Sequence, residues 1–201
     1  GIQFSEILEN RSIRREDVDG IVLSSVVPRL TERLEYACEH YLGMAPLIVS
    51  SDLKLNVSIG YDDPHAVGAD RIADAVAARA LFSVPACVID FGTATTFNAI
   101  NAAGEYLGGA ILPGIGLSAD ALFQRTAKLT TVELKAPPSI IGRNTTHAMQ
   151  SGLIFGYVAL VEGMVARFRE ELGQEMLVVA TGGHVERIAH LTKAIDKVEP
   201  W

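Results

Sequence analysis

The sequence predicts an α/β fold in which mixed sheets are flanked by helices. Hydrophobic residues make up 49% of the 201 residues, enough for a proper core, while aromatic residues are only 6%. Ala, Gly, Val and Ile are plentiful, as expected where helices pack closely on sheets. Short apolar, β-branched runs alternate along the chain with longer segments of helical periodicity.

In the first part of the chain, local signals mark each expected element. An apolar, β-branched run that Pro28 closes predicts a buried strand. Thr31 is a suitable cap for the helix that follows, and Gly43 lies just past the end of that helix. In order, the expected elements are a helix at 4–10, a strand at 21–27, a helix at 31–41, a strand at 47–49 and an alanine-rich helix at 68–82.

The second part of the chain begins with an antiparallel meander. An apolar run ends in Asp90 and a glycine turn, and the residues before Gly104 are typical of a hairpin turn. A long helical pattern further on contains Gly152, Gly156 and Gly163, which indicate close helix contact or a break. The expected elements are strands at 86–90, 95–100 and 106–112, helices at 117–126 and 146–172, a strand at 176–181 and a helix at 185–191.

Composition excludes several classes of function. The formal net charge is −7 and there is no Lys/Arg run, which argues against a nucleic-acid or anionic-membrane partner. No apolar run approaches the roughly 20 residues of a membrane helix. Cys38 and Cys87 stand in apolar surroundings without a CxxC, which predicts reduced core thiols in a cytoplasmic protein. The most natural domain boundary is near Val84-Pro85, where the alanine-rich helix ends.

The first motif with chemical meaning is the turn at 90–93. Gly92 lets the chain approach an anion closely, and the hydroxyls of Thr93 and Thr95 can donate to phosphate oxygens together with backbone N–H groups. Asp90 can hold a cation that offsets the phosphate charge. An ordinary hairpin with a turn Asp is the alternative. Burying an Asp without a partner is costly, which favours the functional interpretation.

The second motif is Gly68-Ala69-Asp70-Arg71, at the start of the alanine-rich helix. Asp70 could act as a general base that takes a proton from an attacking hydroxyl. Arg71 could hold the anionic end of a substrate. The alternative is that the helix dipole simply favours an acidic residue such as Asp70 in the first turn, and that Arg71 is solvated.

Two further motifs precede helices. Thr145 or Thr146 could cap the long helix or could bind a ligand. Gly182 and Gly183 follow an expected strand and could leave room for a nucleoside or a phosphate. His184 beside them carries no clear signal.

In this order and spacing, the motifs resemble one family, the type III pantothenate kinases of the actin, Hsp70 and sugar-kinase superfamily. The resemblance implies two ribonuclease H-like (actin-like ATPase) domains, residues 1–84 and 85–201. It implies ATP-dependent phosphorylation of pantothenate, the first step towards coenzyme A. The matching segments are 61–64, 68–71, 88–96, 108–114, 141–145 and 180–183.

The resemblance also implies roles for individual residues. Asp70 would be the proton acceptor, and Asp90 would bind a monovalent cation, potassium or ammonium. ATP would be used with Mg²⁺, and Thr93 would contact it. Family members form homodimers with pantothenate near the interface, so a homodimer is expected. The expected pantothenate site is Tyr61, Gly68, Ala69, Asp70, Arg71 and Thr145, and the expected ATP site is Gly92, Thr93, Thr95, Gly182 and Gly183.

One departure from the family pattern stands out. The superfamily's first phosphate loop lies at the very N-terminus, and no such segment occurs in these 201 residues. The family's C-terminal helix is also missing after Trp201. The expectation is therefore a chain truncated at both ends, with an incomplete first domain and a crippled activity, because the loop that binds the β- and γ-phosphates is absent. Two alternatives stay open: a non-catalytic regulatory relative, and a superfamily member acting on a sugar or polyphosphate. The motif at 68–71 argues against the latter.

Overall fold

The computed structural model describes residues 6, 8, 10–125 and 131–199. Its internal contacts define two compact units: unit 1 contains residues up to 55 together with 62–73, and unit 2 contains residues 56–61 and those from 74 onward. The expected domains, 1–84 and 85–201, stay a prediction, because compact units need not coincide with the repeated halves of a fold. The helix expected at 4–10 lies mostly outside the described residues.

Unit 1 contains a small parallel sheet and one longer helix. Strands β1 (Val22–Leu23) and β2 (Leu47–Ile48) pair in parallel, with Val22 opposite Leu47. Helix α2 (Pro28–Ala37) continues into a π-helical turn, Cys38–Leu42. Gly43 ends this segment with φ 68°, a left-handed conformation that glycine adopts easily, as predicted. Short 3₁₀ turns lie at Arg15–Asp17 and Pro64–Ala66.

The expectation that Thr31 caps this helix is wrong. Helix α2 begins at Pro28, whose fixed φ suits the first helical position. Thr31 lies within the first turn, where its hydroxyl is 3.1 Å from the Val27 carbonyl oxygen. The strand expected at 21–27 is shorter than predicted, because β1 pairs with β2 over only two residues, Val22 and Leu23.

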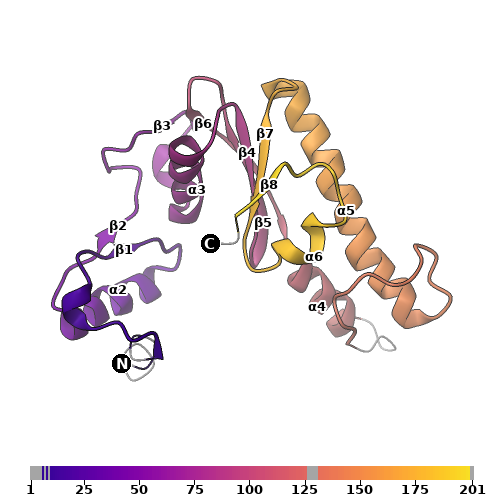
Figure 1. Cartoon of the computed structure of the whole chain (residues 1–201), viewed down its shortest axis with the longest axis horizontal. Coiled ribbons are helices and arrows are strands. Elements are labelled where there is room, and N and C mark those ends of the chain that lie inside the picture. Colours follow the sequence, from indigo (N-terminus) through magenta and orange to yellow (C-terminus); the bar gives the residue numbers. More distant parts are fainter. Residues whose placement is uncertain (1–5, 7, 9, 126–130, 200–201) are drawn as a thin grey trace. The chain divides into compact units, whose positions relative to one another are not determined.

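Unit 2 is built on a six-stranded mixed sheet in the order β3-β6-β5-β4-β7-β8 (Figure 1). The predicted antiparallel meander β4-β5-β6 is confirmed, and β7 lies parallel to β4 on its other side. Strands β3 and β8 were not predicted, since neither lies in a longer apolar run as β1 and β2 do. The strands are β3 (Ser58–Ile59), β4 (Ala86–Phe91), β5 (Ala94–Ile100), β6 (Glu105–Pro113), β7 (Leu177–Thr181) and β8 (Lys197–Val198).

Helices lie against both faces of this sheet, with α5 along one side and α3 along the other (Figure 1). Phe97 on β5 packs against Phe168 on α5, with ring centroids 5.7 Å apart. Asn98, the next residue on β5, points to the opposite face and bonds to Asp74 on α3. The α/β fold with helix-flanked mixed sheets is therefore confirmed. The helices are α3 (Ala69–Leu81), α4 (Ile115–Arg125), α5 (Thr145–Leu172) and α6 (Val185–Ala189).

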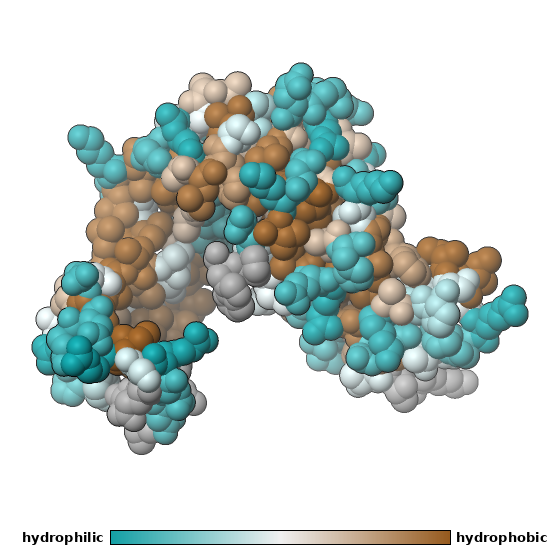
Figure 2. Space-filling view, in the orientation of Figure 1, coloured by the Kyte–Doolittle hydropathy of each residue, from teal (hydrophilic) through white to brown (hydrophobic). Residues whose placement is uncertain are grey.

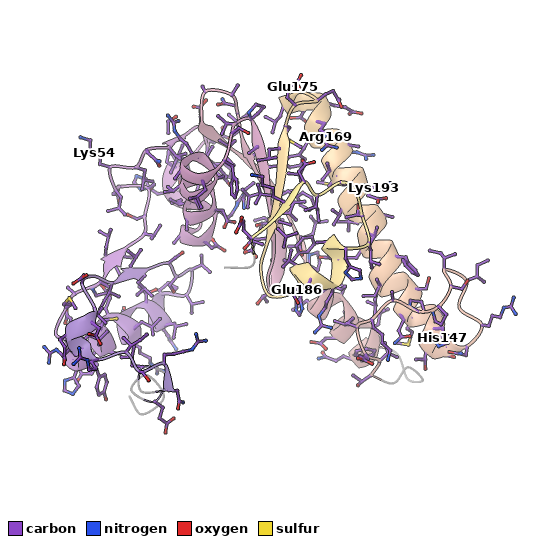
Figure 3. The ribbon with its side chains drawn as sticks, in the orientation of Figure 1. Lys54, His147, Arg169, Glu175, Glu186 and Lys193 are labelled. Carbon is purple, nitrogen blue, oxygen red and sulfur yellow. The ribbon has the colours of Figure 1, made fainter. Side chains whose placement is uncertain are left out.

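Helix α5 is the longest described element, and by length and composition alone it could cross a membrane. Half of its most apolar stretch is buried inside the protein. Ile154, Val161 and Val165 of this helix belong to the main hydrophobic cluster, together with Ile89 of β4. Near its C-terminal end (Figure 3), the Arg169 guanidinium lies 3.5 Å from an Asp196 carboxylate oxygen. These contacts make α5 a core helix of unit 2.

Candidate functional site

The turn at 90–93 stands at the end of β4, beside the end of a parallel strand. Asp90 is opposite Thr96 on β5 and opposite Thr181 on β7. Because β4 and β7 run in parallel, their carboxyl ends meet at the same edge of the sheet, the usual place for ligand sites in α/β proteins. Thr93 is exposed there, and Gly92 is half-buried.

The turn after β7 packs directly on the turn after β4. The His184 backbone N–H donates to the Phe91 carbonyl over 3.1 Å. Gly182 has φ 95°, and a Cβ atom at this position would collide with an Asp90 carboxylate oxygen and lie 2.7 Å from the Phe91 backbone N. Only glycine fits there without strain. Gly183 has open space around it within the described part of the chain.

A third glycine closes the same turn from the other side. The Gly114 N–H donates to the Thr93 carbonyl over 3.0 Å, and a Cβ atom on Gly114 would lie 2.6 Å from the Gly92 carbonyl oxygen. Helix α4 begins at the next residue, so its N-terminus, which favours anions, starts beside the turn. Gly114 was not among the predicted site residues, although its place between Pro113 and a predicted helix was a visible signal.

The Thr95 side chain faces the core. Its exposure is 0%, and its hydroxyl lies 2.7 Å from the Tyr157 phenol oxygen, which is also 2.7 Å from the Pro113 carbonyl oxygen. A carbonyl only accepts, so Tyr157 donates to Pro113 and the Thr95 hydroxyl donates to Tyr157. Burial raises the pKa of Tyr157, and the hydrogen bond with Thr95 partly offsets this. The Thr95 hydroxyl therefore links the turn to Tyr157 of α5 on the buried side of the sheet. Its role as an ATP ligand stays a prediction.

Asp90 is the candidate cation ligand of this site. It is half-buried at the edge of the sheet. The described residues contain no group of three or more His, Cys, Asp and Glu side chains that could hold a metal ion. A single carboxylate can hold a cation together with backbone, solvent or nucleotide oxygens, and the monovalent cation expected at Asp90 stays a prediction.

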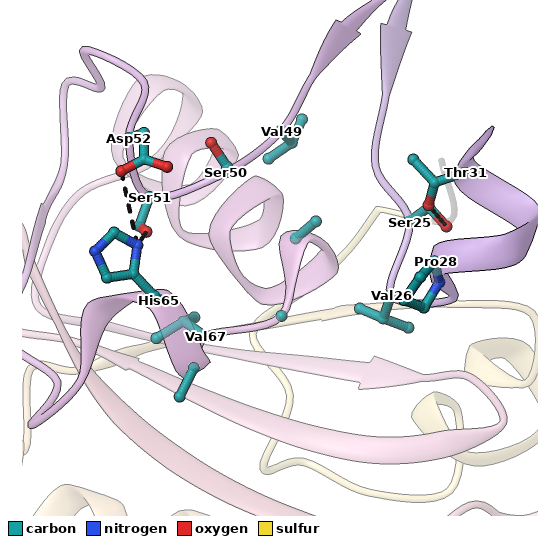
Figure 4. A pocket seen from close by; sticks show the side chains of 13 residues that line it. Ser25, Val26, Pro28, Thr31, Val49, Ser50, Ser51, Asp52, His65 and Val67 are labelled. Carbon is teal, nitrogen blue, oxygen red and sulfur yellow. Dashed lines mark hydrogen bonds and ion pairs between the residues drawn. The ribbon is translucent and has the colours of Figure 1, made fainter. Parts of the chain in front are cut away.

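Unit 1 contains a cavity of about 470 Å³ at the start of α3 (Figure 4). Gly68 and Ala69, two of the predicted substrate residues, line it. On one side His65 Nδ1 lies 3.2 Å from Ser51 Oγ and 3.6 Å from an Asp52 carboxylate oxygen. Figure 4 shows Ser25 and Thr31 on the opposite side of the same cavity. The cavity therefore presents hydroxyl, imidazole and carboxylate groups to a small polar ligand.

Asp70 and Arg71 differ sharply in their surroundings. Asp70 is exposed, and one of its carboxylate oxygens accepts the Arg71 backbone N–H over 2.9 Å. A Cβ atom on Gly68 would lie 2.5 Å from the same oxygen and 3.1 Å from Val26 Cγ1, so glycine makes room there. Arg71 is only 6% exposed. The alternative that Arg71 is simply solvated is therefore wrong, whereas the base role of Asp70 stays a prediction.

Two predicted substrate residues belong to unit 2. The Tyr61 ring lies 6.4 Å from that of Tyr106. Thr145 is the exposed first residue of α5. Asn144 caps this helix by accepting the His147 N–H over 2.8 Å, and His147 is seen near this end of α5 in Figure 3. The expectation that Thr145 or Thr146 is the cap is thus wrong; asparagine is among the best capping residues.

Close-packed glycines, an acidic residue and a helix N-terminus thus meet at the carboxyl edge of the sheet of an α/β protein, where the sequence predicts a phosphate site. A family model described as type III pantothenate kinase matches residues 1–167, and the chain belongs to this family. The family consists of ATP-using phosphotransferases.

Two solved structures are similar. One, from Campylobacter jejuni, is named as a Baf family transcriptional activator; the match covers 92% of this chain and 78% of that one, at 22% identity and a TM-score of 0.57. This degree of identity shows a shared fold alone. The other is the activator of the 2-hydroxyisocaproyl-CoA dehydratase from Clostridium difficile with bound ADPNP, at 14% identity over 89% of this chain and 76% of that one. Its TM-score of 0.37 corresponds to only a loose structural similarity.

Proposed function

We propose that the protein transfers the γ-phosphoryl group of ATP to pantothenate, forming 4'-phosphopantothenate. The observation that carries this proposal is the packing of the Gly182 turn on Asp90 and Phe91, next to the exposed Thr93. Phosphoryl transfer depends mainly on positioning and on neutralising charge, and these turns offer backbone N–H groups, a hydroxyl and a cation ligand. Membership in a family of type III pantothenate kinases supports pantothenate as the acceptor.

On this proposal the ATP phosphates lie over Gly92, Thr93, Gly182 and Gly183. Mg²⁺ accompanies the nucleotide and offsets its charge, while Asp90 holds potassium or ammonium. Thr95 supports the turn through Tyr157. The exposed Thr93 and the open space around Gly183 are compatible with a phosphate at this edge, which favours the assignment.

Pantothenate would bind at the start of α3, where the family resemblance implies Gly68, Ala69 and Arg71 as substrate residues. The resemblance implies Tyr61 and Thr145 as the further substrate residues. The cavity of about 470 Å³ beside Gly68 falls within the usual size of small-molecule sites. Asp70 is exposed and so can meet a substrate hydroxyl, as a general base must.

The finer architecture belongs to the same proposal. The order β6-β5-β4-β7-β8, an antiparallel meander followed by two parallel strands, supports a ribonuclease H-like second half. A cytoplasmic homodimer is expected. Hydrophobic side chains that a dimer could cover reach the surface over the loop before α5 (Figure 2), where Ile140 and Ile141 are 64% and 75% exposed. The molar mass in solution tests the homodimer: a monomeric mass would contradict it.

The experiment is a phosphotransfer assay on the protein with its natural termini, with ATP, Mg²⁺ and potassium. The acceptors are pantothenate, a hexose and polyphosphate. Pantothenate alone should be phosphorylated, and Asp70→Asn should lower kcat on the order of 1,000-fold, since general-base catalysis contributes about 10²–10⁴. Asp19→Asn is the matched control and should keep full activity, because Asp19 is an exposed carboxylate in the irregular segment between Asp17 and β1.

Two results would reject the proposal. Transfer to a hexose or polyphosphate instead of pantothenate would identify a different kinase of the superfamily. Nucleotide binding without any transfer, with Asp70→Asn indistinguishable from the unmodified protein, would identify the non-catalytic regulatory relative.

A further inference from the structure

Helix α3 is bonded to the sheet of unit 2 by a buried polar network centred on Asn98. The Asn98 side chain is 0% exposed. Its amide nitrogen donates to an Asp74 carboxylate oxygen over 2.9 Å and to the Thr96 hydroxyl oxygen over 3.1 Å. Its amide oxygen accepts the Tyr106 hydroxyl over 3.4 Å. Both amide hydrogens and the amide oxygen are thus in use.

The network joins the two elements that carry the proposed chemistry. Thr96 is directly opposite Asp90 in the β4-β5 register, and side-chain alternation places Asp90, Thr96 and Asn98 on the same face of the sheet. On α3, Asp74 follows Asp70 by four residues, so both lie on one side of the helix. The helix that carries the proposed base is therefore bonded to the strand beside the proposed cation ligand.

We propose that Asn98 and Asp74 are positioning residues for the phosphoryl transfer. Their hydrogen bond sets the rotation of α3 about its own axis and thereby the direction of the Asp70 carboxylate. This inference rests on the proposed function, because it gives the network a task only if Asp70 acts on the substrate. A misplacement of about 1 Å costs on the order of 100-fold in rate, so a small rotation is enough to matter.

Packing alone does not account for the network. A fully buried amide costs free energy that a leucine would not, and its benefit is that it accepts only one arrangement of its neighbours. A second anchor holds the far end of the helix, where the Arg79 guanidinium donates to the carbonyls of Ala103 and Gly104 over 3.0 and 2.9 Å. Arg79 has a long, flexible side chain, and it lies further from Asp70 in the helix. The hydrogen bond of Asp74 is thus the better placed of the two to set the orientation of the first turn of α3, which carries Asp70.

The primary test is Asp74→Ala, since alanine keeps the helix intact while removing the acceptor. The expected result is a 10- to 100-fold lower kcat with pantothenate, per folded molecule, and a KM for ATP within about twofold of the unmodified value. The matched control is Asp196→Ala, which removes a carboxylate that accepts the Val178 N–H over 2.8 Å near β8 in the same unit. This control should lower the Tm without lowering kcat.

The second test exchanges the two groups. Asn98→Asp alone opposes two carboxylates at hydrogen-bond distance and should be the least active variant. Combining it with Asp74→Asn lets the amide at position 74 donate to the carboxylate at position 98, to which the Tyr106 and Thr96 hydroxyls can also donate. The double variant should recover at least about tenfold in kcat over Asn98→Asp.

Each outcome has a defined meaning. Full kcat per folded molecule in Asp74→Ala, or a folded double variant no better than Asn98→Asp, would overturn the positioning role while leaving the kinase assignment intact. An unmodified protein that fails to phosphorylate pantothenate would reject the proposed function, and this inference with it.

Discussion

The contact of Tyr157 with Thr95 provides a sharp test of how the phosphate turn is supported. In Tyr157→Phe the phenol oxygen is lost, and with it the partner of the buried Thr95 hydroxyl and of the Pro113 carbonyl. An unsatisfied buried polar group costs about 1–3 kcal/mol. Thr95 is fully buried and Pro113 can reach water, so we expect a loss of about 2 kcal/mol in the free energy of unfolding, chiefly from Thr95.

Thermal unfolding followed by circular dichroism measures this loss. For a protein of this size, about 2 kcal/mol corresponds to a Tm lower by about 4–8 °C. Tyr36→Phe is the matched control, because Tyr36 is 65% exposed, and its Tm should stay within about 1 °C.

A double-mutant cycle with Thr95→Val isolates the pair. If the two hydroxyls bond as described, the combined variant should be less destabilised than the sum of the single ones by about 1 kcal/mol. Additive losses, or a Tyr157→Phe variant as stable as the Tyr36→Phe control, would refute this account of the turn. A raised KM for ATP in Thr95→Val with unchanged stability would instead make Thr95 a direct nucleotide ligand.

Three further predictions concern the same sheet. Gly182→Ala should lower the free energy of unfolding by about 2 kcal/mol and raise the KM for ATP, since φ 95° strains any side chain and the added Cβ meets Asp90. Gly183→Ala should do neither, because Gly183 has open space around it. Equal effects of the two substitutions in denaturant titrations and ATP kinetics would contradict the packing described. Burial raises the pKa of the Cys87 thiol to about 12, above the roughly 8.5 of an unfolded thiol. Only the unfolded state loses this proton as the pH rises from about 9 to 12, so the free energy of unfolding from urea titrations should fall by up to about 1.4 kcal/mol per pH unit. The fall should be smaller in Cys87→Ala. The same dependence of this free energy on pH in both proteins would exclude a buried neutral thiol. Asp90→Asn should abolish activation by potassium in a kinase assay, and unchanged activation would remove Asp90 from the cation site.

Much of the fold could be predicted because its signals are local. The alanine-rich helix α3, the long helix α5 and the meander that starts at Ala86 have their predicted types and nearly their predicted bounds. The caps were harder: Asn144 competes with Thr145 and Thr146 for the cap of α5, whereas α2 begins at Pro28 without a capping side chain, which leaves Thr31 inside the helix. Strands β3 and β8 pair with strands elsewhere in the chain and, unlike β1 and β2, do not lie in a longer apolar run.

The candidate site was predicted unevenly for the same reason. The motifs around Asp90 and Gly182 were visible in the sequence, and the structure brings them together at one edge of the sheet. The hydrogen bond of Thr95 with Tyr157, 62 residues further along, could not be predicted from either segment alone. Nor could the burial of Arg71 be predicted, since that depends on how the first turn of α3 packs.

The most direct test of the central claim follows the phosphoryl group itself. Protein with its natural termini, supplied with γ-labelled ATP, Mg²⁺, potassium and pantothenate, should yield labelled 4'-phosphopantothenate, identified by mass spectrometry, and Asp70→Asn should reduce this product on the order of 1,000-fold. Label that never reaches pantothenate, or that reaches it equally in Asp70→Asn, would contradict the account.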